Sequence, residues 1–300
     1  MPASPAPRPT AAHREAATRP ERASRPEMAT RPEVVARLRA AGCVYAEDEA
    51  DLLLGAARSP AELDDLVTRR ASGLPLEPLL GWAEFCGLRI AVEPGVFVPR
   101  RRTELVVAQA VALARPGAVV VDLCCGSGAI GTALAAQVEH LDLHATDIEP
   151  AAVRCARRNI EPAGGHVYSG DLFDPLPARL RGRVDLIVVN APYVPTDAIA
   201  TMPPEARLHE PRVTLDGGGD GLDVHRRVAA RAADWLAPGG SLVIETSRSQ
   251  AAGTVDLVER SGLTARVTTS DELQATVVIG IRAGGARRAD QGADGGAGGR

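Results

Sequence analysis

Apolar residues recur along the chain in two rhythms, and each rhythm predicts its own kind of element. Short continuous apolar runs lie between residues 118 and 189, and the run 184–189 ends directly before Asn190. Such runs are typical of parallel strands that are buried on both faces. Stretches with apolar residues three or four positions apart, which predict helices, separate them. The alternation predicts an α/β fold built on a mostly parallel sheet.

The pattern gives seven expected strands and five expected helices in the larger part of the chain. The strands are expected at residues 118–122, 141–146, 166–168, 184–189, 241–245, 263–268 and 274–281. The helices are expected at residues 104–114, 129–137, 150–159, 222–236 and 250–260. Pro-Gly-Gly at 238–240 is expected to form a turn before the strand 241–245.

A smaller helical unit and a hairpin are expected before the sheet. Helices are predicted at 32–41, 46–58 and 59–72, with Leu52 and Leu53 facing inward and Ser59 as an N-cap three positions before Glu62. The alternating pattern that follows predicts a β-hairpin with its turn at 93–95. The expected domains are a substrate-docking helical domain at 31–78, a hairpin linker at 79–98 and the α/β domain at 99–282.

The two ends of the chain lack the apolar residues that an ordered core requires. Residues 1–30 are rich in Pro and Arg, and Arg-Pro-Glu recurs at 19–21, 25–27 and 31–33. Residues 283–300 are rich in Gly and Ala. Both compositions predict disordered tails. Met28 is an alternative start of translation, and we leave open whether it or Met1 is used.

Composition argues against a nucleic-acid-binding, metal-binding or membrane protein. The net charge is −4, aromatic residues make up 3% of the chain, and every basic residue is Arg, so no stable nucleic-acid binding is expected. Five cysteines without a C-x-x-C pair favour a reduced, cytoplasmic setting, and neither they nor the histidines show metal-ligand spacing. No apolar run reaches the about 18 residues of a membrane span, and no secretory signal opens the chain.

Glycines and acids follow the ends of the first three expected strands, where an open α/β sheet binds its ligands. The loop 124–128, Cys-Cys-Gly-Ser-Gly, allows a ligand to approach the backbone closely. Asp147 can accept hydrogen bonds from both hydroxyls of a ribose. Asp171 can accept from an exocyclic amine, and Leu172 can pack on an adenine face, although a capping Asp and a core Leu also fit the pattern.

The glycines of this loop also match a dinucleotide-binding fingerprint. Gly126, Gly128 and Gly131 have the G-x-G-x-x-G spacing, with an acid about 20 residues further on. The glycines begin four residues after Asp122, which makes the loop longer than the tight dinucleotide turn. No second half suited to hydride transfer follows, so an oxidoreductase is a distant alternative.

The fourth strand ends in the tetrapeptide Asn190-Ala191-Pro192-Tyr193. The Asn190 amide offers an acceptor and a donor, Pro192 keeps Ala191 extended so that its carbonyl has a fixed direction, and Tyr193 offers an aromatic face. Together these groups are suited to hold a planar –NH2 group and to aim its nitrogen. An ordinary strand-to-loop exit with a turn proline fits the same residues.

Two further segments are candidates for ligand contacts. Arg100, Arg101 and Arg102 can bind an acidic or phosphate partner, and a solvated linker fits them equally well. Thr103 after them is expected to cap the helix 104–114. The long loop through 216–221 is typical of a lid, and its Asp and Gly residues lack the spacing of a calcium-binding loop.

The ordered set of motifs resembles the S-adenosylmethionine-dependent methyltransferases of the class I, Rossmann-like fold. More closely, it is similar to the HemK/PrmC-type release-factor glutamine methyltransferases over residues 77–281. The motifs that carry the resemblance are Glu77-Pro78-Leu79, Pro99-Arg100, Thr103-Glu104, Asp122-Leu123, Gly126-Ser127-Gly128-Ala129-Ile130, Gly170-Asp171-Leu172-Phe173, Asn190 with Pro192-Tyr193, Glu210-Pro211, and Gly218 with Asp220-Gly221-Leu222-Asp223.

The resemblance implies an enzyme that transfers a methyl group from S-adenosyl-L-methionine, without a metal, to a glutamine side-chain amide. The implied partner is a peptide chain release factor, methylated in its Gly-Gly-Gln motif. The implied cofactor-binding residues are Asp122, Cys124, Cys125, Gly126, Ser127, Gly128, Asp147, Ile148, Asp171, Leu172 and Asn190. The implied catalytic and substrate-binding residues are Asn190, Ala191, Pro192 and Tyr193, with Arg100 also on the substrate side.

Some residues depart from the family pattern near the expected site. Ala191 stands for a proline, Cys124-Cys125 for Gly-Thr, Arg101-Arg102 for a proline and an acid, and Thr246 for a glycine. These changes leave open a divergent paralogue that methylates nucleic acid, another protein or a small molecule. A binding protein that keeps the fold without turnover is a further alternative.

Overall fold

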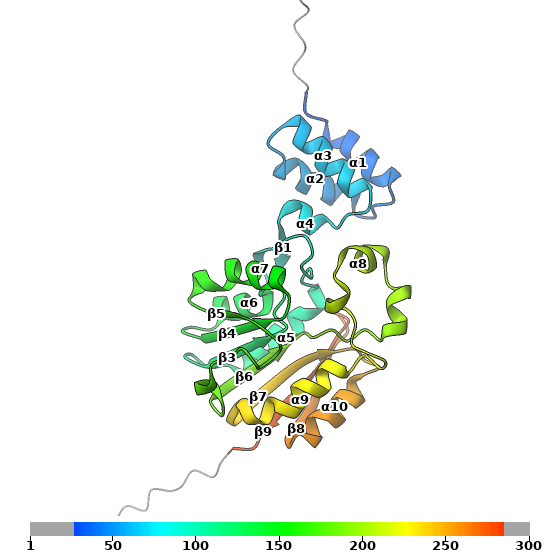
Figure 1. The fold of residues 1–300 in the computed structure, drawn as a ribbon. Coiled ribbons are helices and arrows are strands. Elements are labelled where there is room, and N and C mark those ends of the chain that lie inside the picture. The colour runs from blue at the N-terminus through cyan, green and yellow to red at the C-terminus, as the bar shows by residue number, and fades with distance from the viewer. Residues whose placement is uncertain (1–26, 285–300) are drawn as a thin grey trace, which may run out of the picture.

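Seven strands form one sheet in the order β5–β4–β3–β6–β7–β9–β8 (Figure 1). The structure is a computed structural model that describes residues 27–284, with the side chains of all but residues 204 and 205. The strands are β3 (Val119–Leu123), β4 (Asp142–Asp147), β5 (His166–Ser169), β6 (Val184–Val189), β7 (Leu236–Thr246), β8 (Leu263–Ser270) and β9 (Ala275–Arg282). The first five in this order are parallel, and β9 runs antiparallel to both β7 and β8. The expected mostly parallel, seven-stranded sheet is confirmed.

Helices cover both faces of this sheet. They are α5 (Glu104–Leu113), α6 (Ala129–Gln137), α7 (Pro150–Ile160), α9 (Asp223–Trp235) and α10 (Ala251–Arg260). Alternate strand residues supply the two cores: Val120 packs with the α5–α7 side, and Val121 packs with the α9 side. Burial on both faces is why these strands are apolar throughout.

The chain order places a ligand site at the carboxyl end of β3. From β3 the chain proceeds to β4 and β5 on one side, and it then returns to β6 on the other side. The loops after β3 and β6 therefore diverge and leave a crevice between them. The glycine loop and the Asn190 tetrapeptide follow these two strands.

Three helices before the sheet share a core of their own. They are α1 (Arg31–Ala40), α2 (Ala46–Ala56) and α3 (Pro60–Ala71), and Leu38, Leu53 and Leu63 are buried among them. The Ser59 hydroxyl accepts from the Glu62 N–H at 3.2 Å, as the capping pattern predicts. The prediction that Leu52 faces inward is wrong, because its side chain is on the exposed side of α2.

The expected hairpin is present, but its turn is two residues long and lies earlier. After the short helix α4 (Leu76–Leu80), β1 (Trp82–Phe85) pairs with β2 (Leu88–Ala91). Cys86 and Gly87 form the turn with φ values of 51° and 73°, the combination that a two-residue hairpin of type I′ requires. The predicted turn at 93–95 is therefore wrong as the hairpin turn. It forms a separate bend that the Val96 N–H closes on the Glu93 carbonyl.

Two other predictions need correction. Pro238–Gly240 lies inside β7, where the register with β6 shifts and the extra residues are accommodated as an irregularity. The long loop after β6 is broken by η4 (Thr196–Thr201), α8 (Pro204–His209) and η5 (Arg212–Thr214). Most of the predicted disordered tails lie outside the described residues. Within residues 27–284 no helix is long and apolar enough to cross a membrane.

Candidate active site

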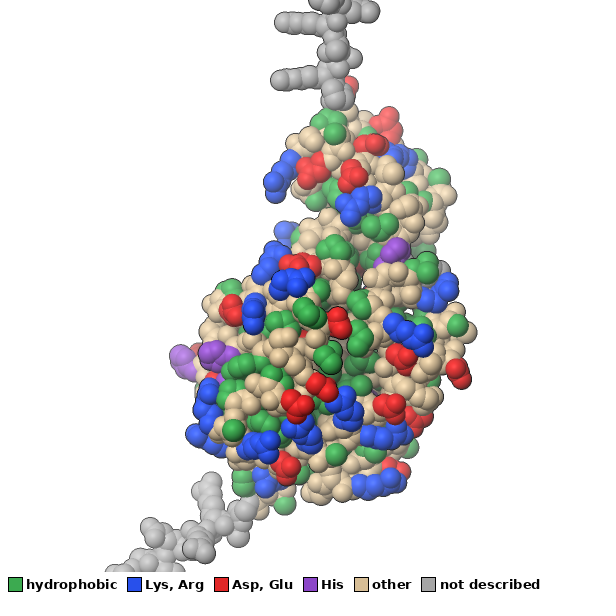
Figure 2. Space-filling view, viewed as in Figure 1, with side chains coloured by type: hydrophobic (Ala, Val, Ile, Leu, Met, Phe, Trp, Pro, Cys, Tyr) green, Lys and Arg blue, Asp and Glu red, His purple; other side chains and the backbone are tan. Residues whose placement is uncertain are grey.

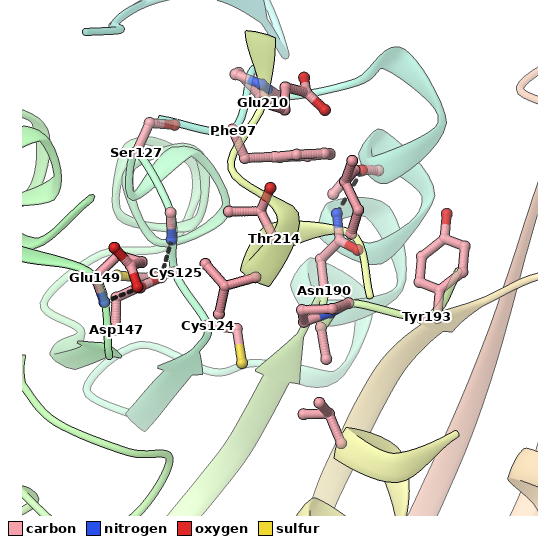
Figure 3. A pocket seen from close by; sticks show the side chains of 18 of the residues that line it. Phe97, Cys124, Cys125, Ser127, Asp147, Glu149, Asn190, Tyr193, Glu210 and Thr214 are labelled. Atoms are coloured by element: carbon pink, nitrogen blue, oxygen red, sulfur yellow. Dashed lines mark hydrogen bonds between the residues drawn. The ribbon is translucent and has the colours of Figure 1, made fainter. Parts of the chain in front are cut away.

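A cavity of about 510 Å³ opens at the carboxyl ends of β3, β4 and β6 (Figure 3). Its volume lies in the range of small-molecule and cofactor sites. Asp147 and Glu149 lie at one end, and Asn190 and Tyr193 at the other, with Cys124 between them. The loops that follow three different strands therefore form one site.

The loop after β3 is shaped by residues with positive φ. Cys124, Gly126 and Gly128 have φ values of 54°, 55° and 79°. A β-carbon on Gly128 would lie 2.8 Å from Ile160 Cδ1, so glycine is needed there for both conformation and space. The departure at Cys124 puts a side chain into a conformation that favours glycine, at a cost of about 1–2 kcal/mol.

Asp122 lies beneath this loop and does not line the cavity. It is fully buried, and its Oδ2 accepts from the Gly131 N–H at 3.0 Å, which ties the start of α6 to β3. Burial raises the pKa of its carboxyl to about 7. Gly128, like Asp122, is not among the lining residues. Of the predicted cofactor-binding residues, these two support the loop from behind.

Asp147 stands where the sequence places it, at the end of β4 and on the cavity wall. Its carboxylate accepts from the Gly126 N–H at 2.8 Å and from the Glu149 N–H at 2.9 Å. These bonds fix its direction, and burial raises its pKa. Beside it, Ile148 is 53% exposed and lines the cavity, which leaves an apolar surface that a flat ring can cover.

The third strand end brings Asp171 and Leu172 to the same wall. Asp171 forms an ion pair with Arg227 from α9 through Oδ2, which leaves Oδ1 as an acceptor. Leu172 is 5% exposed and has a φ of 47°, and it belongs to the core on the α9 side. Leu172 is a core residue that also forms part of the cavity wall, and its contact with an adenine ring stays a prediction.

The tetrapeptide after β6 is anchored at both ends. Asn190 Nδ2 donates to Thr103 Oγ1 at 3.1 Å. Tyr193 donates its hydroxyl to Glu245 Oε1 at 3.0 Å, and burial together with the Glu245 charge raises the pKa of the phenol, so it stays protonated. Arg102 Nε donates to the same Glu245 oxygen at 3.2 Å. Ala191 is buried between these anchors.

Thr103 is not the helix cap that the sequence predicts. It belongs to the 3₁₀ turn η1 (Arg101–Thr103), which leads directly into α5, and its side chain makes no capping bond. Its hydroxyl faces Asn190 instead. The backbone is already helical where it enters α5. The Glu104 N–H therefore donates to carbonyl oxygens of η1 and needs no side-chain cap.

Each arginine of the triplet pairs with a glutamate from a distant element. Arg100 pairs with Glu210 after α8, Arg101 with Glu272 before β9, and Arg102 with Glu245 at the end of β7. Arg100 and Arg102 thus anchor this segment, whereas Arg101 and Glu272 are both exposed to solvent. Arg100 lines the cavity, as its predicted substrate role requires, but its guanidinium is engaged.

Several lining residues were not predicted from the sequence. They are Phe97, Thr103, Glu149, Glu210 and Thr214. Thr103 and Glu210 stood within motifs of the resemblance, which was the one available signal for them. Among residues 27–203 and 206–284 no group of three His, Cys, Asp or Glu side chains is arranged to hold a metal ion.

Comparisons with known proteins agree with this geometry. Residues 87–220 match the methyltransferase small domain family. The release factor glutamine methyltransferase of Geobacter sulfurreducens is 41% identical over 221 residues, 73% of this chain and 77% of the relative. The chain belongs to the release factor glutamine methyltransferase family. The family member from Mycolicibacterium smegmatis is 38% identical over 256 residues, 79% of this chain and 90% of its own length.

One further relative and one solved structure are also similar to this chain. The 4-amino-L-phenylalanine/4-methylamino-L-phenylalanine methyltransferase of Streptomyces pristinaespiralis is 37% identical over 232 residues, 75% of this chain and 78% of the relative. The crystal structure of a methyltransferase from Pyrococcus furiosus shares the fold, with a TM-score of 0.51 and 18% identity. It covers 66% of this chain and 90% of its own. The class I methyltransferase fold is confirmed.

Proposed function

We propose that the protein is an S-adenosylmethionine-dependent methyltransferase that methylates the N5 nitrogen of a glutamine side chain. The proposed substrate is the Gly-Gly-Gln motif of a peptide chain release factor, the class of protein that the names of its relatives give. Because release factors act in the cytoplasm, we propose the same location for this enzyme. The observation that carries the proposal is the anchored tetrapeptide facing a cofactor-sized cavity.

The residues around the cavity fit S-adenosylmethionine. The Asp147 carboxylate, oriented by two backbone N–H groups, still has lone pairs for the hydroxyls of a ribose. Ile148 offers exposed apolar surface for the adenine ring, and the loop 124–128 offers backbone that a ligand can approach closely. When bound, the cofactor supplies a methyl group on a positively charged sulfur, which needs no further activation.

The task left to the protein is to orient a weak nucleophile. The nitrogen of a glutamine amide is weak because its lone pair is delocalised into the carbonyl group. Asn190 Oδ1 and the Ala191 carbonyl would accept its two N–H hydrogens and so fix the plane of the amide. Such orientation is worth several kcal/mol of the reaction barrier. Tyr193, held by Glu245, would close the far side of the substrate amide.

A methyl-transfer assay tests this proposal. Wild type and Asn190→Ala are incubated with labelled S-adenosylmethionine and an intact bacterial release factor, and peptide mass spectrometry locates the label. We expect label on the glutamine of Gly-Gly-Gln with wild type, and a loss of at least about 100-fold with Asn190→Ala, which keeps the fold. Equal labelling by the two proteins contradicts the role of Asn190. Wild type that binds the cofactor without labelling the release factor contradicts the substrate.

A second candidate function is methylation of an aromatic amine on a free amino acid. The relative from Streptomyces pristinaespiralis favours it, because it is named for that reaction at 37% identity. An aromatic –NH2 group presents the same two N–H donors to Asn190 and Ala191 as a glutamine amide does. Incubation with 4-amino-L-phenylalanine in place of the release factor separates the two functions.

A further inference from the structure

The side chain of Asn190 has one partner among the side chains that the structure describes. Asn190 Nδ2 donates to Thr103 Oγ1 at 3.1 Å, and no described group donates to Asn190 Oδ1 (Figure 3). Thr103 is 3% exposed, so water has little access to its side of this bond. Asn190 lines the cavity. The hydroxyl therefore holds the donor end of the amide and leaves the acceptor end for a ligand.

We infer that Thr103 is a positioning residue that fixes the Asn190 amide with Oδ1 available to the substrate. The inference rests on the proposed function, in which Oδ1 accepts from an N–H of the substrate. A flipped amide would present its own NH2 to the NH2 of the substrate, so that donor would meet donor. Without the Thr103 hydroxyl the Asn190 amide loses its one described partner and turns about its own bond, so Oδ1 meets the substrate N–H less often.

The position of Thr103 is itself fixed by the segment around it. Its N–H donates to the Arg100 carbonyl at 2.9 Å within the turn η1. On either side, Arg100 is paired with Glu210 and Arg102 with Glu245. Because Glu245 also accepts from Tyr193, consecutive residues 102 and 103 hold the two ends of the tetrapeptide. A hydroxyl on such an anchored segment holds the Asn190 side chain in one place, with Nδ2 toward Thr103.

The chain offers a direct readout, because Asn159 and Asn190 are its only asparagines. Protein labelled with ¹⁵N at asparagine should give two side-chain NH2 signal pairs, and Asn190→Ala assigns them. Asn159 Nδ2 donates to the carbonyls of Ala91 and Ser127, which makes its pair an internal reference. No substrate is needed for this measurement.

Thr103→Val keeps the shape of the side chain and removes the hydroxyl, whereas Thr103→Ser keeps the hydroxyl. In Thr103→Val we expect the Asn190 pair to shift and its hydrogens to exchange faster with water, with the Asn159 pair unchanged. Thr103→Ser should keep the wild-type spectrum. Thr254→Val is the control for loss of a buried hydroxyl, since Thr254 is 1% exposed and does not line the cavity.

Methyl transfer is measured on the same proteins with the release factor. We expect Thr103→Val to lower kcat about 10- to 100-fold, because a small misplacement of a reacting group has an effect of this size. KM and the affinity for S-adenosylmethionine should stay within about threefold, and Thr103→Ser and Thr254→Val should stay near wild type.

Three results would overturn the inference. They are an Asn190 pair that is unchanged in Thr103→Val, a Thr103→Ser variant as impaired as Thr103→Val, and a shifted pair with unchanged kcat. If wild type does not label the release factor, the proposed function fails by itself. The asparagine spectra then still decide whether Thr103 fixes the amide.

Discussion

Gly128 is the residue of the loop 124–128 whose replacement has the clearest structural consequence. Its φ is 79°, and an added β-carbon would lie 2.8 Å from Ile160 Cδ1 and 3.3 Å from the Ala156 backbone. Gly126 has a similar φ of 55°, but nothing lies within 4 Å of its β-carbon position. The two glycines therefore separate the effect of backbone conformation from the effect of space.

We predict that Gly128→Ala destabilises the protein by about 2–3 kcal/mol and weakens S-adenosylmethionine binding. Gly126→Ala should destabilise by about 1 kcal/mol, the conformational part alone. Urea unfolding gives the free energies, and calorimetry gives the affinities. Equal destabilisation by the two substitutions would show that Ile160 and α7 move aside without cost.

Asp122 gives the stability a dependence on pH. Burial raises the pKa of its carboxyl in the folded protein to about 7, well above the ordinary range of an aspartate. A group of this kind stabilises the fold fully below its unfolded-state pKa, and the contribution is lost as the pH rises through about 7.

Asp122→Asn keeps a carbonyl oxygen for the Gly131 N–H and removes the titration. We predict that wild type and this variant have similar stability near pH 4, and that the variant is more stable by about 2–4 kcal/mol at pH 8. Urea unfolding across this range checks it. A difference that does not change with pH would show that the carboxyl of Asp122 does not titrate differently in the folded protein.

At the scale of elements, the ion pair between Arg100 and Glu210 joins the segment before α5 to the long loop after β6. Glu210 is buried, and Arg100 is partly exposed. Removing the charge of Glu210 leaves the charge of Arg100 uncompensated. The contact between the loop and the segment before α5 is then less stable. The neighbouring pair of Arg101 and Glu272 is exposed on both sides and offers a matched control.

We predict that Glu210→Gln loosens the loop that carries α8. Trypsin should then cleave after the exposed Arg207 and Arg212 about tenfold faster than in wild type, because local opening costs less free energy. Glu272→Gln should be cleaved at the wild-type rate, since an exposed ion pair contributes little. The same rate in both variants would mean that the loop is held by its other contacts.

At the scale of the whole molecule, the helical unit of α1 to α3 stands apart from the cavity, at the opposite end from α9 and α10 (Figure 1). Val44 and Tyr45, between α1 and α2, are 83% and 70% exposed. Acidic and basic side chains are intermingled on the face of the molecule seen in Figure 2, without one continuous basic surface. If this unit docks the substrate, as predicted, we therefore expect it to do so through apolar contacts of Val44 and Tyr45.

We predict that Val44→Ser with Tyr45→Ser raises KM for an intact release factor about tenfold, since two partly apolar contacts of this size contribute on the order of 1–2 kcal/mol. KM for a short peptide that contains Gly-Gly-Gln should not change, because such a peptide reaches the cavity alone. Methyl-transfer kinetics with both substrates check this. Equal changes for protein and peptide would exclude docking by this surface.

The sequence by itself determined the elements and the place of the site. The strand Val184–Val189 was predicted because a strand covered on both faces must be apolar throughout. Asn190 and Asp147 were placed at one edge because parallel strands all end on the same side. Helix α6 and the capping by Ser59 followed in the same way. These features depend on short windows of sequence, in which each residue responds to its near neighbours.

The tertiary structure alone decided which side chains meet. Thr103 stands 87 positions before Asn190, and Arg100 stands 110 positions before Glu210. Thr103 was predicted to cap a helix, since a hydroxyl directly before a helix has that local preference. The hairpin turn was likewise predicted at Glu93-Pro94-Gly95, whereas Cys86 and Gly87 form it. A bond between distant residues exists only after packing has brought their elements together, so local periodicity carries no information about it.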